Sequence, residues 1–145
     1  MNINKQIIST LDCLSDSQIM ISDSIIDVLN LGFTTYQYPV LIKNSSIQEL
    51  VIHSAWFKGG LLLENCIIKE VINYEMGGHN ESPIVINDNI FQDLFIFYDC
   101  HFQDKLIIRN NIFNKGSTLL IEKLNIFQSG LELNDNIGDM YKSLD

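Results

Sequence analysis

The sequence predicts an all-β fold, a right-handed parallel β-helix (solenoid) of about five coils with about 22 residues in each. Three observations lead to this prediction. A unit of ten to twelve residues repeats along most of the chain, β-branched and aromatic residues alternate with other residues inside each unit, and Asn, Asp or Ser stands where the alternation breaks. The repeat is clearest between residues 93 and 115, where Phe95 and Phe97 recur eleven residues later as Leu106 and Ile108.

Four positions of each unit are expected to point inward, at offsets 0, 2, 5 and 7 from its first residue. Offsets 0 and 2 alternate, as do offsets 5 and 7, and a period of two is that of a β-strand. The phase breaks at offsets 3 and 4, where turn-forming Asn and Asp are common. Each unit therefore reads as strand, corner, strand, corner. The units begin at Ile19, Leu29, Val40, Leu50, Leu61, Ile72, Ile84, Phe95, Leu106 and Leu131.

Two units complete one coil, so residues two units apart are expected to lie above one another. A strand with two inward residues buries too little surface to be stable alone, and stacking of similar coils makes the interior continuous. The position at offset 5 holds Ser24, Ser45 and Cys66 early in the chain and Asn89 and Asn111 later. These amides predict a stacked ladder that satisfies buried backbone groups at one corner.

Two internal segments fit the repeat less well. Residues 75–83, EMGGHNESP, predict a loop because they combine Gly-Gly with Ser-Pro. Residues 114–127 hold about three residues too many. One interpretation places Leu119 and Ile121 in the strand, followed by a bulge, and the alternative places a loop before Leu119.

Both ends of a solenoid expose unpaired strand edges and are expected to be capped. Ile3, Ile7, Leu11 and Leu14 are spaced as on a helix, which predicts a short N-terminal helix or, alternatively, an irregular strand over the first coil. The last residues predict a smaller C-terminal lid. The expected organisation is an N-terminal cap at 1–18, a β-helix domain at 19–138 and a C-terminal lid at 139–145.

The second half of each unit resembles the pentapeptide-repeat family, in which a small inward residue alternates with a large one. The small positions hold Ser24, Ser45, Ala55, Cys66 and Cys100, and the large ones hold Ile26, Ile47, Phe57, Ile68 and Phe102. The resemblance covers about residues 19 to 138. The chain departs from the family because the first half of each unit has two large inward residues and because the unit is one residue longer than two pentapeptides.

A second resemblance lies in residues 107–113, IIRNNIF, which are similar to the Asn-containing coils of right-handed β-helix proteins such as pectate lyases. Both resemblances imply a solenoid. Proteins of these groups include carbohydrate-active enzymes, acidic DNA-mimicking inhibitors of topoisomerases and many proteins without an assigned activity.

Composition excludes several classes of function. The chain has 145 residues and a net charge of -9, with nine basic and eighteen acidic residues and no basic cluster, so we expect no direct contact with nucleic acid. No signal peptide and no apolar run long enough for a membrane span are recognised. Three cysteines without a CxxC motif indicate reduced thiols, and we expect a cytoplasmic protein.

Few residues are candidates for a catalytic or metal-binding role. Cys66 and Cys100 share one repeat position and are expected to be buried thiols that fill a narrow corner. His53, His79 and His101 fall at different offsets and are expected to point in different directions, so no metal site is predicted. His79 and Glu81 lie in the irregular loop and are the candidates for a functional loop. We expect no catalytic residue and no cofactor, and we predict that the protein is not an enzyme.

Outward positions show one asymmetry. In alternate units, offsets 1 and 6 are aliphatic and predict two apolar stripes on one side of the solenoid, a pattern that usually marks an interface. The predicted interface residues are Leu41, Leu62, Ile67, Val85, Ile90, Ile107 and Ile112. We expect this face to be buried by a second copy of the chain, as in most symmetric dimers, or by the N-terminal segment.

The predicted function is that of a non-catalytic module that binds a protein partner, such as a small acidic inhibitor or a toxin-neutralising immunity protein. Two alternatives stay open. The pentapeptide resemblance implies a DNA mimic that binds a topoisomerase. The second alternative is a carbohydrate-binding or carbohydrate-cleaving β-helix. It would need a groove lined by aromatic residues, and only Trp56 and His101 are candidates for that lining.

Overall fold

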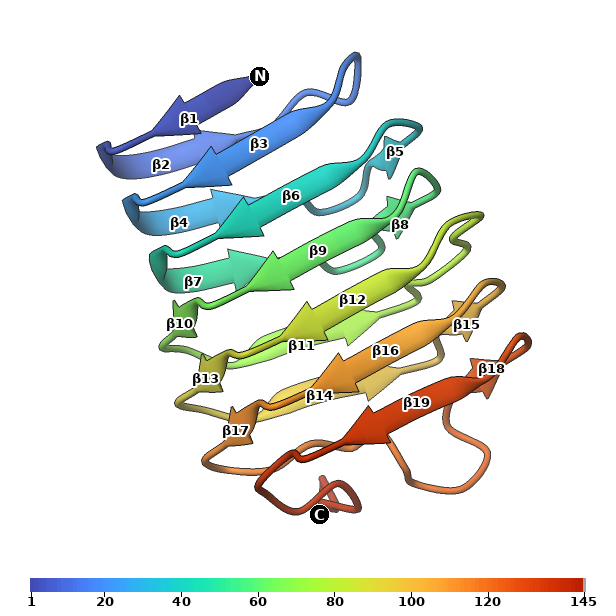
Figure 1. The fold of residues 1–145 in the computed structure, drawn as a ribbon. Coiled ribbons are helices and arrows are strands. Elements are labelled where there is room, and N and C mark those ends of the chain that lie inside the picture. Colours follow the sequence, from blue (N-terminus) through green and yellow to red (C-terminus); the bar gives the residue numbers. More distant parts are fainter. Residues whose placement is uncertain (145) are drawn as a thin grey trace.

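The computed structural model describes residues 1–144, which wind into a parallel β-solenoid of about six turns and contain strands but no helix (Figure 1). The nearer strands in the view run to the left, the more distant ones run to the right, and each coil steps down toward the C-terminus. This path is right-handed, as crossovers between parallel strands almost always are. The predicted fold class is therefore confirmed.

Two larger sheets and three short pairs of strands form the walls of the solenoid. The seven-stranded sheet contains β1 (Asn2–Asn4), β3 (Ile19–Ser22), β6 (Val40–Lys43), β9 (Leu61–Glu64), β12 (Ile84–Asn87), β16 (Leu106–Arg109) and β19 (Leu131–Asn134). The six-stranded sheet contains β2 (Ile7–Asp12), β4 (Ile25–Asn30), β7 (Ser46–Val51), β10 (Ile67–Ile68), β13 (Ile90–Phe91) and β17 (Ile112–Phe113). The pairs are β11 (Ile72–Glu75) with β14 (Phe95–Tyr98), β5 (Thr35–Tyr36) with β8 (Trp56–Phe57), and β15 (His101–Phe102) with β18 (Ile126–Phe127).

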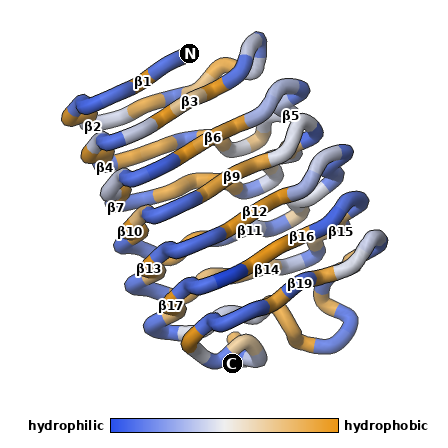
Figure 2. The backbone as a smooth tube through the Cα atoms, in the orientation of Figure 1, coloured by the Kyte–Doolittle hydropathy of each residue, from blue (hydrophilic) through white to orange (hydrophobic). Residues whose placement is uncertain are grey.

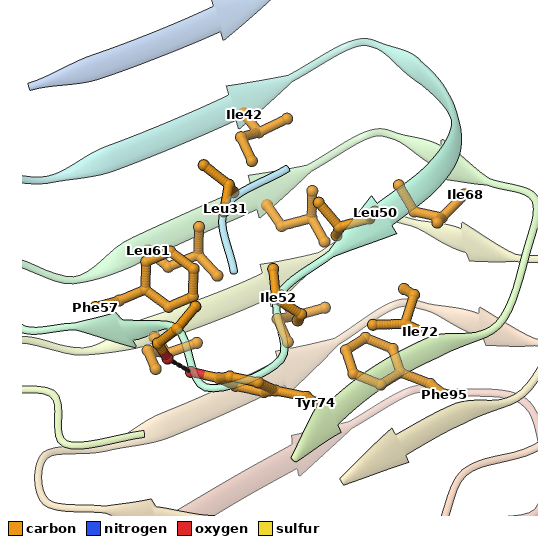
Figure 3. Close-up of a cluster of buried hydrophobic side chains, with 14 of the residues drawn as sticks. Leu31, Ile42, Leu50, Ile52, Phe57, Leu61, Ile68, Ile72, Tyr74 and Phe95 are labelled. Carbon is orange, nitrogen blue, oxygen red and sulfur yellow. Dashed lines mark hydrogen bonds between the residues drawn. The ribbon is translucent and has the colours of Figure 1, made fainter. Parts of the chain in front are cut away.

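Most inward positions are those that the repeat predicts, and His79 is an exception. Ile19, Ile21 and Ile26 are buried, and so are their counterparts in the following coils as far as Leu106, Ile108 and Phe113, whereas Leu131 and Leu133 of the last coil are half-buried. Figure 3 shows how side chains from several coils meet in the interior, with Tyr74 among the aliphatic residues. Because each coil covers the next, a two-residue inward strand becomes part of one continuous core.

The corner after each strand of the seven-stranded sheet turns through a residue with positive φ. These residues are Lys5, Asp23, Asn44, Asn65, Asp88, Asn110 and Asp135. Asn and Asp tolerate this left-handed conformation better than other residues that bear a Cβ. The predicted turn chemistry is thus present at six of these seven corners.

The predicted amide ladder stands directly behind these corners. The backbone N–H of Cys66 donates to Asn89 Oδ1 at 2.9 Å, that of Asn89 donates to Asn111 Oδ1 at 2.9 Å, and that of Asn111 donates to Asn136 Oδ1 at 3.0 Å. In the earlier coils a hydroxyl does the same, since the N–H of Ser24 donates to Ser45 Oγ at 3.1 Å. The ladder is confirmed.

The N-terminal segment is not a helix. Residues 2–4 and 7–12 form β1 and β2, which pair in register with β3 and β4, so the first eighteen residues make a further coil. Ile3, Ile8 and Leu11 face the core, whereas Ile7 is 85% exposed. The helical prediction failed because pairing with the next coil satisfies the backbone groups of this segment and the adjacent β-branched residues favour a strand.

Residues 114–127 also differ from the sequence prediction. Ser117, not Leu119, pairs with Phe95, and the extra residues form the turns between Leu119 and Asn125. The insertion follows the inward strand position, as the first interpretation has it, but Leu119 and Ile121 lie in its turns and not in the strand, which is shifted by two residues to Ser117. The segment that follows β19 lies along Ser117, whose N–H donates to Asp139 O at 2.7 Å, and therefore extends the solenoid.

Candidate functional site

The predicted interface residues occupy two rows on neighbouring sheets. In the seven-stranded sheet Leu41, Leu62, Val85 and Ile107 are paired in register across four strands, and Met20 precedes them. We call these five residues the first apolar row. Ile67, Ile90 and Ile112 are paired in the six-stranded sheet and Ile137 follows them, whereas Ser46 stands between Ile67 and Ile25. We call these five isoleucines the second apolar row.

A polar corner separates the two rows. It consists of the outward ends of the front strands, such as Lys43 and Glu64, and of the positive-φ residues Asn44 and Asn65. Figure 2 shows this corner as a hydrophilic band at the left ends of the nearer strands. The two rows therefore run side by side but are not parts of one flat surface.

No described segment of the chain covers either row. The N-terminal segment continues the solenoid above β3 and β4 instead of folding back over the outer surface. The first row ends at polar residues on both sides, because Asn2 pairs with Met20 and Glu132 pairs with Ile107. The first row is thus a bounded patch of apolar side chains.

The three histidines, which we expected to point in different directions, gather along one edge of the solenoid. The ring of His79 lies 4.1 Å from that of Trp56 and 5.7 Å from that of His101, as measured between ring centroids. The ring of His53 stacks at 4.8 Å on that of Phe33. The expectation was wrong because His79 has a φ of 51°, which turns its side chain out of the inward position at offset 7.

The space that His79 leaves inside is filled by Tyr74. Its hydroxyl donates to Ala55 O at 3.0 Å and accepts from the N–H of Gly78 at 3.0 Å. A Cβ on Gly77 would lie 2.0 Å from the Tyr74 ring, so only glycine fits at that position. The size of the buried tyrosine therefore explains Gly77, whereas Gly78 has a φ of 91° and a Cβ on it would clash with the backbone carbonyl of His101.

An open groove of about 310 Å³ lies beside these rings. It is lined by Phe33, Thr34, Thr35, Ser54, Trp56 and Met76, and we call it the aromatic groove. Phe33 is 75% exposed, Met76 44% and Trp56 36%. The indole N–H of Trp56 donates to Met76 O at 3.0 Å, which fixes the indole against the wall of the groove.

The proposed functional loop contributes one of its two residues to this edge. His79 backs the Trp56 ring, and burial, with His101 and Lys58 nearby, lowers its pKa from the ordinary value. Glu81 is exposed, and its backbone N–H donates to Lys58 O at 3.0 Å. The sequence pattern missed Phe33, His53 and Met76, although Phe33 and Met76 could have been noticed at turn positions where Asn or Asp is usual.

A hydroxyl, an imidazole and a carboxylate form a chain at the same edge. Ser54 Oγ lies 2.9 Å from His53 Nδ1, and His53 Nε2 lies 3.1 Å from Glu75 Oε2. Serine hydrolases use such a chain together with free backbone N–H groups that stabilise an oxyanion. Here the N–H groups of Ser54, Ala55 and Trp56 donate to Glu75 O, Ile52 O and Thr34 O. The Ser54 and Glu75 side chains therefore hold the His53 ring in place, and the three backbone N–H groups are not free to bind an oxyanion.

The cysteines are buried and unpaired, as the repeat predicts for two of them. Burial raises the pKa of Cys66 to about 11 and that of Cys100 to about 12. Cys100 Sγ lies 3.0 Å from Tyr74 O, so the protonated thiol donates to the backbone. A thiol with such a high pKa is a weak nucleophile at neutral pH.

Residues 1–144 contain no group of three or more His, Cys, Asp or Glu side chains placed to hold a metal ion. The same part of the chain has no helix that is long and apolar enough to cross a membrane. Comparison of the chain with models of protein families, with curated proteins and with solved structures finds no match. The likeness to pentapeptide repeats therefore remains a resemblance of pattern.

Proposed function

We propose that this protein is a non-catalytic protein-interaction module that uses the first apolar row as its contact surface and a second copy of the chain as its partner. The observation that supports this proposal is the row itself, in which Met20, Leu41, Leu62, Val85 and Ile107 stack in register on the outer face of the seven-stranded sheet. Large aliphatic side chains on the surface of an acidic chain favour association, because burial removes them from water.

Two further observations support a binding role over a catalytic one. The chain of Ser54, His53 and Glu75 lacks neighbouring amides for an oxyanion, since those amides already donate to carbonyl groups. The buried cysteines keep their protons at neutral pH. The net charge of -9 would favour association with a basic protein partner.

Within this proposal, an acidic inhibitor or immunity protein in the cytoplasm is the class that we favour, and three unpaired cysteines suit that compartment. The DNA mimic is its electrostatic form, as the resemblance to pentapeptide repeats implies. Association of such a mimic with a basic protein should slow steeply as the salt concentration rises. An association rate that does not depend on salt would contradict the mimic.

The test compares the two rows by light scattering. We expect the unmodified protein to be a dimer and the double variant Leu62→Lys with Val85→Lys to be a monomer with an unchanged circular dichroism spectrum. The comparison variant is Ile67→Lys with Ile90→Lys, which places the same charges on the second row. These two residues belong to the predicted interface, but the proposal assigns the contact to the first row, which no polar residue interrupts, so this variant should leave the dimer intact. A monomeric unmodified protein, or a dimer that survives charges on the first row, contradicts the proposal.

A further inference from the structure

The aromatic groove is built from residues that are poorly suited to their backbone. Phe33, Ser54 and Met76 have φ values of 55°, 53° and 52°. The left-handed region is unfavourable for a residue other than Gly, Asn or Asp. At the opposite corner of the coil the chain uses Asn or Asp at six of seven such positions. Since the side chains of Phe33 and Met76 are exposed, they do not offset this cost by filling the core.

Such a conflict between residue type and backbone conformation is expected where a residue serves binding more than folding. The rings are also held in place before any ligand arrives. Phe33 stacks on His53 at an interplanar angle of 24°, and His53 is itself held by Ser54 and Glu75. Trp56 is fixed by its bond to Met76 O and by the His79 ring. Fixed rings lose little entropy when a ligand binds.

We propose that the aromatic groove binds a neutral sugar residue. The six lining residues offer two aromatic rings, a thioether and three hydroxyl-bearing side chains, and none of them is charged. One face of a hexopyranose ring presents C–H groups that pack on an aromatic ring, and its hydroxyls reach polar groups at the rim. The net charge of -9 disfavours an anionic polysaccharide.

A peptide suits the groove less well than a sugar. An extended peptide that adds to a sheet pairs with free backbone groups at an edge. The N–H groups of Phe33, Ser54 and Trp56 donate instead to His53 O, Glu75 O and Thr34 O in neighbouring coils, at 2.8–3.0 Å. The groove therefore presents rings and hydroxyls to a ligand, and it lies on a different part of the surface from the first apolar row.

The experiment uses the fluorescence of Trp56, the only tryptophan of the chain. Cellohexaose, maltohexaose and mannohexaose are titrated into the full chain up to millimolar concentration. We expect at least one of them to give a saturable change, and trigalacturonate to give none. Phe33→Asn should weaken the binding by about tenfold or more, as loss of an aromatic anchor does. Its stability should be equal or higher, because Asn suits a positive φ.

The matched control is Tyr98→Asn, which removes another exposed aromatic ring, 42% accessible, that does not line the groove. It should leave the affinity for the sugar unchanged. The proposal is overturned if none of the three sugars changes the fluorescence, if a proline-rich or aromatic peptide binds and the sugars do not, or if Phe33→Asn binds as tightly as the unmodified protein. None of these outcomes bears on the dimer, which is measured by mass.

Discussion

Replacement of Asn111 by Leu tests how the amide ladder stabilises the solenoid. Asn111 is fully buried, and its Oδ1 accepts from the backbone N–H and from Nδ2 of Asn89, at 2.9 and 3.0 Å. Its Nδ2 donates to Ile86 O at 2.9 Å and to Asn136 Oδ1 at 3.0 Å. Leu has the same branched shape and the same number of side-chain heavy atoms as Asn, so the change removes these hydrogen bonds without opening a cavity.

The main loss comes from the backbone N–H of Asn89, which is left in the core without its acceptor. A buried donor without a partner costs about 1–3 kcal/mol, and the lost bond to Ile86 adds about 1 kcal/mol. Asn89 Nδ2 keeps its bond to Leu63 O at 2.9 Å, so the side chain of Asn89 remains paired. We therefore expect Asn111→Leu to lower the free energy of unfolding by about 2–4 kcal/mol.

Asn111→Ser is the matched control, because the earlier coils already use Ser at this position. A hydroxyl accepts from the N–H of the preceding coil, as Ser45 Oγ does from Ser24 at 3.1 Å, and the variant loses only the amide donor. We expect about half of the loss that Leu causes. Urea unfolding is followed by far-UV circular dichroism and by Trp56 fluorescence, and coincident transitions justify a two-state free energy.

The reasoning is refuted if Asn111→Leu costs less than about 1 kcal/mol. It is also refuted if Ser destabilises the protein as much as Leu does, because the loss would then not arise from the unpaired N–H group.

Three further predictions follow from the core and from the buried titratable groups. Phe97→Ala should cost about 3–5 kcal/mol in the same urea experiment, as large-to-small core changes do, and a loss below about 1 kcal/mol would mean that the ring is not in the core. Folding lowers the pKa of His79, so the unfolded chain binds the proton more readily and stability should fall as the pH drops below the ordinary value of 6.5; a His79→Gln variant with the same pH dependence would contradict this. Cys13, Cys66 and Cys100 should not react with a thiol reagent in the native state at mildly alkaline pH, because burial raises their pKa to about 11, 11 and 12; reaction faster than unfolding would show an open thiol.

The inward face of the solenoid was predictable because every coil must bury apolar side chains at the same positions. Phe95, Phe97 and Phe102 recur in type and spacing, and stacking of parallel coils leaves one place for each of them. The amide ladder was predictable for the same reason, since Asn89 and Asn111 share one position in successive coils. In this part of the chain the two-residue period of the strands and the turn-forming residues at the corners predict the same fold. A fold can be predicted from the sequence where such local signals agree.

The edge with the histidines was not predictable from the repeat. The offset rule assigns His79 to the interior, but its positive φ turns the side chain outward, and Tyr74 fills the interior in its place. Backbone conformation at a single residue is not encoded in hydrophobic periodicity. The N-terminal coil was predicted only as the alternative, an irregular strand, because Ile3, Ile7 and Leu11 also have the spacing of a helix.

The corner ladder has a consequence for how the chain avoids misfolding. A protein made of similar coils can pair a coil with the wrong neighbour, since the backbone would still find partners after a shift by one repeat. Here the residue in the slot changes along the chain from Ser24 and Ser45 through Cys66 to Asn89 and Asn111. If the coil of Ser45 paired directly with the coil of Asn89, a short hydroxyl would face a longer amide side chain. The coil of Cys66, which lies between them in the native order, would then lose its partners. The change of residue at this position thus distinguishes the junctions of the early coils, Ser24 with Ser45, Ser45 with Cys66 and Cys66 with Asn89, from the Asn–Asn junctions that follow, and it disfavours pairing between early and late coils.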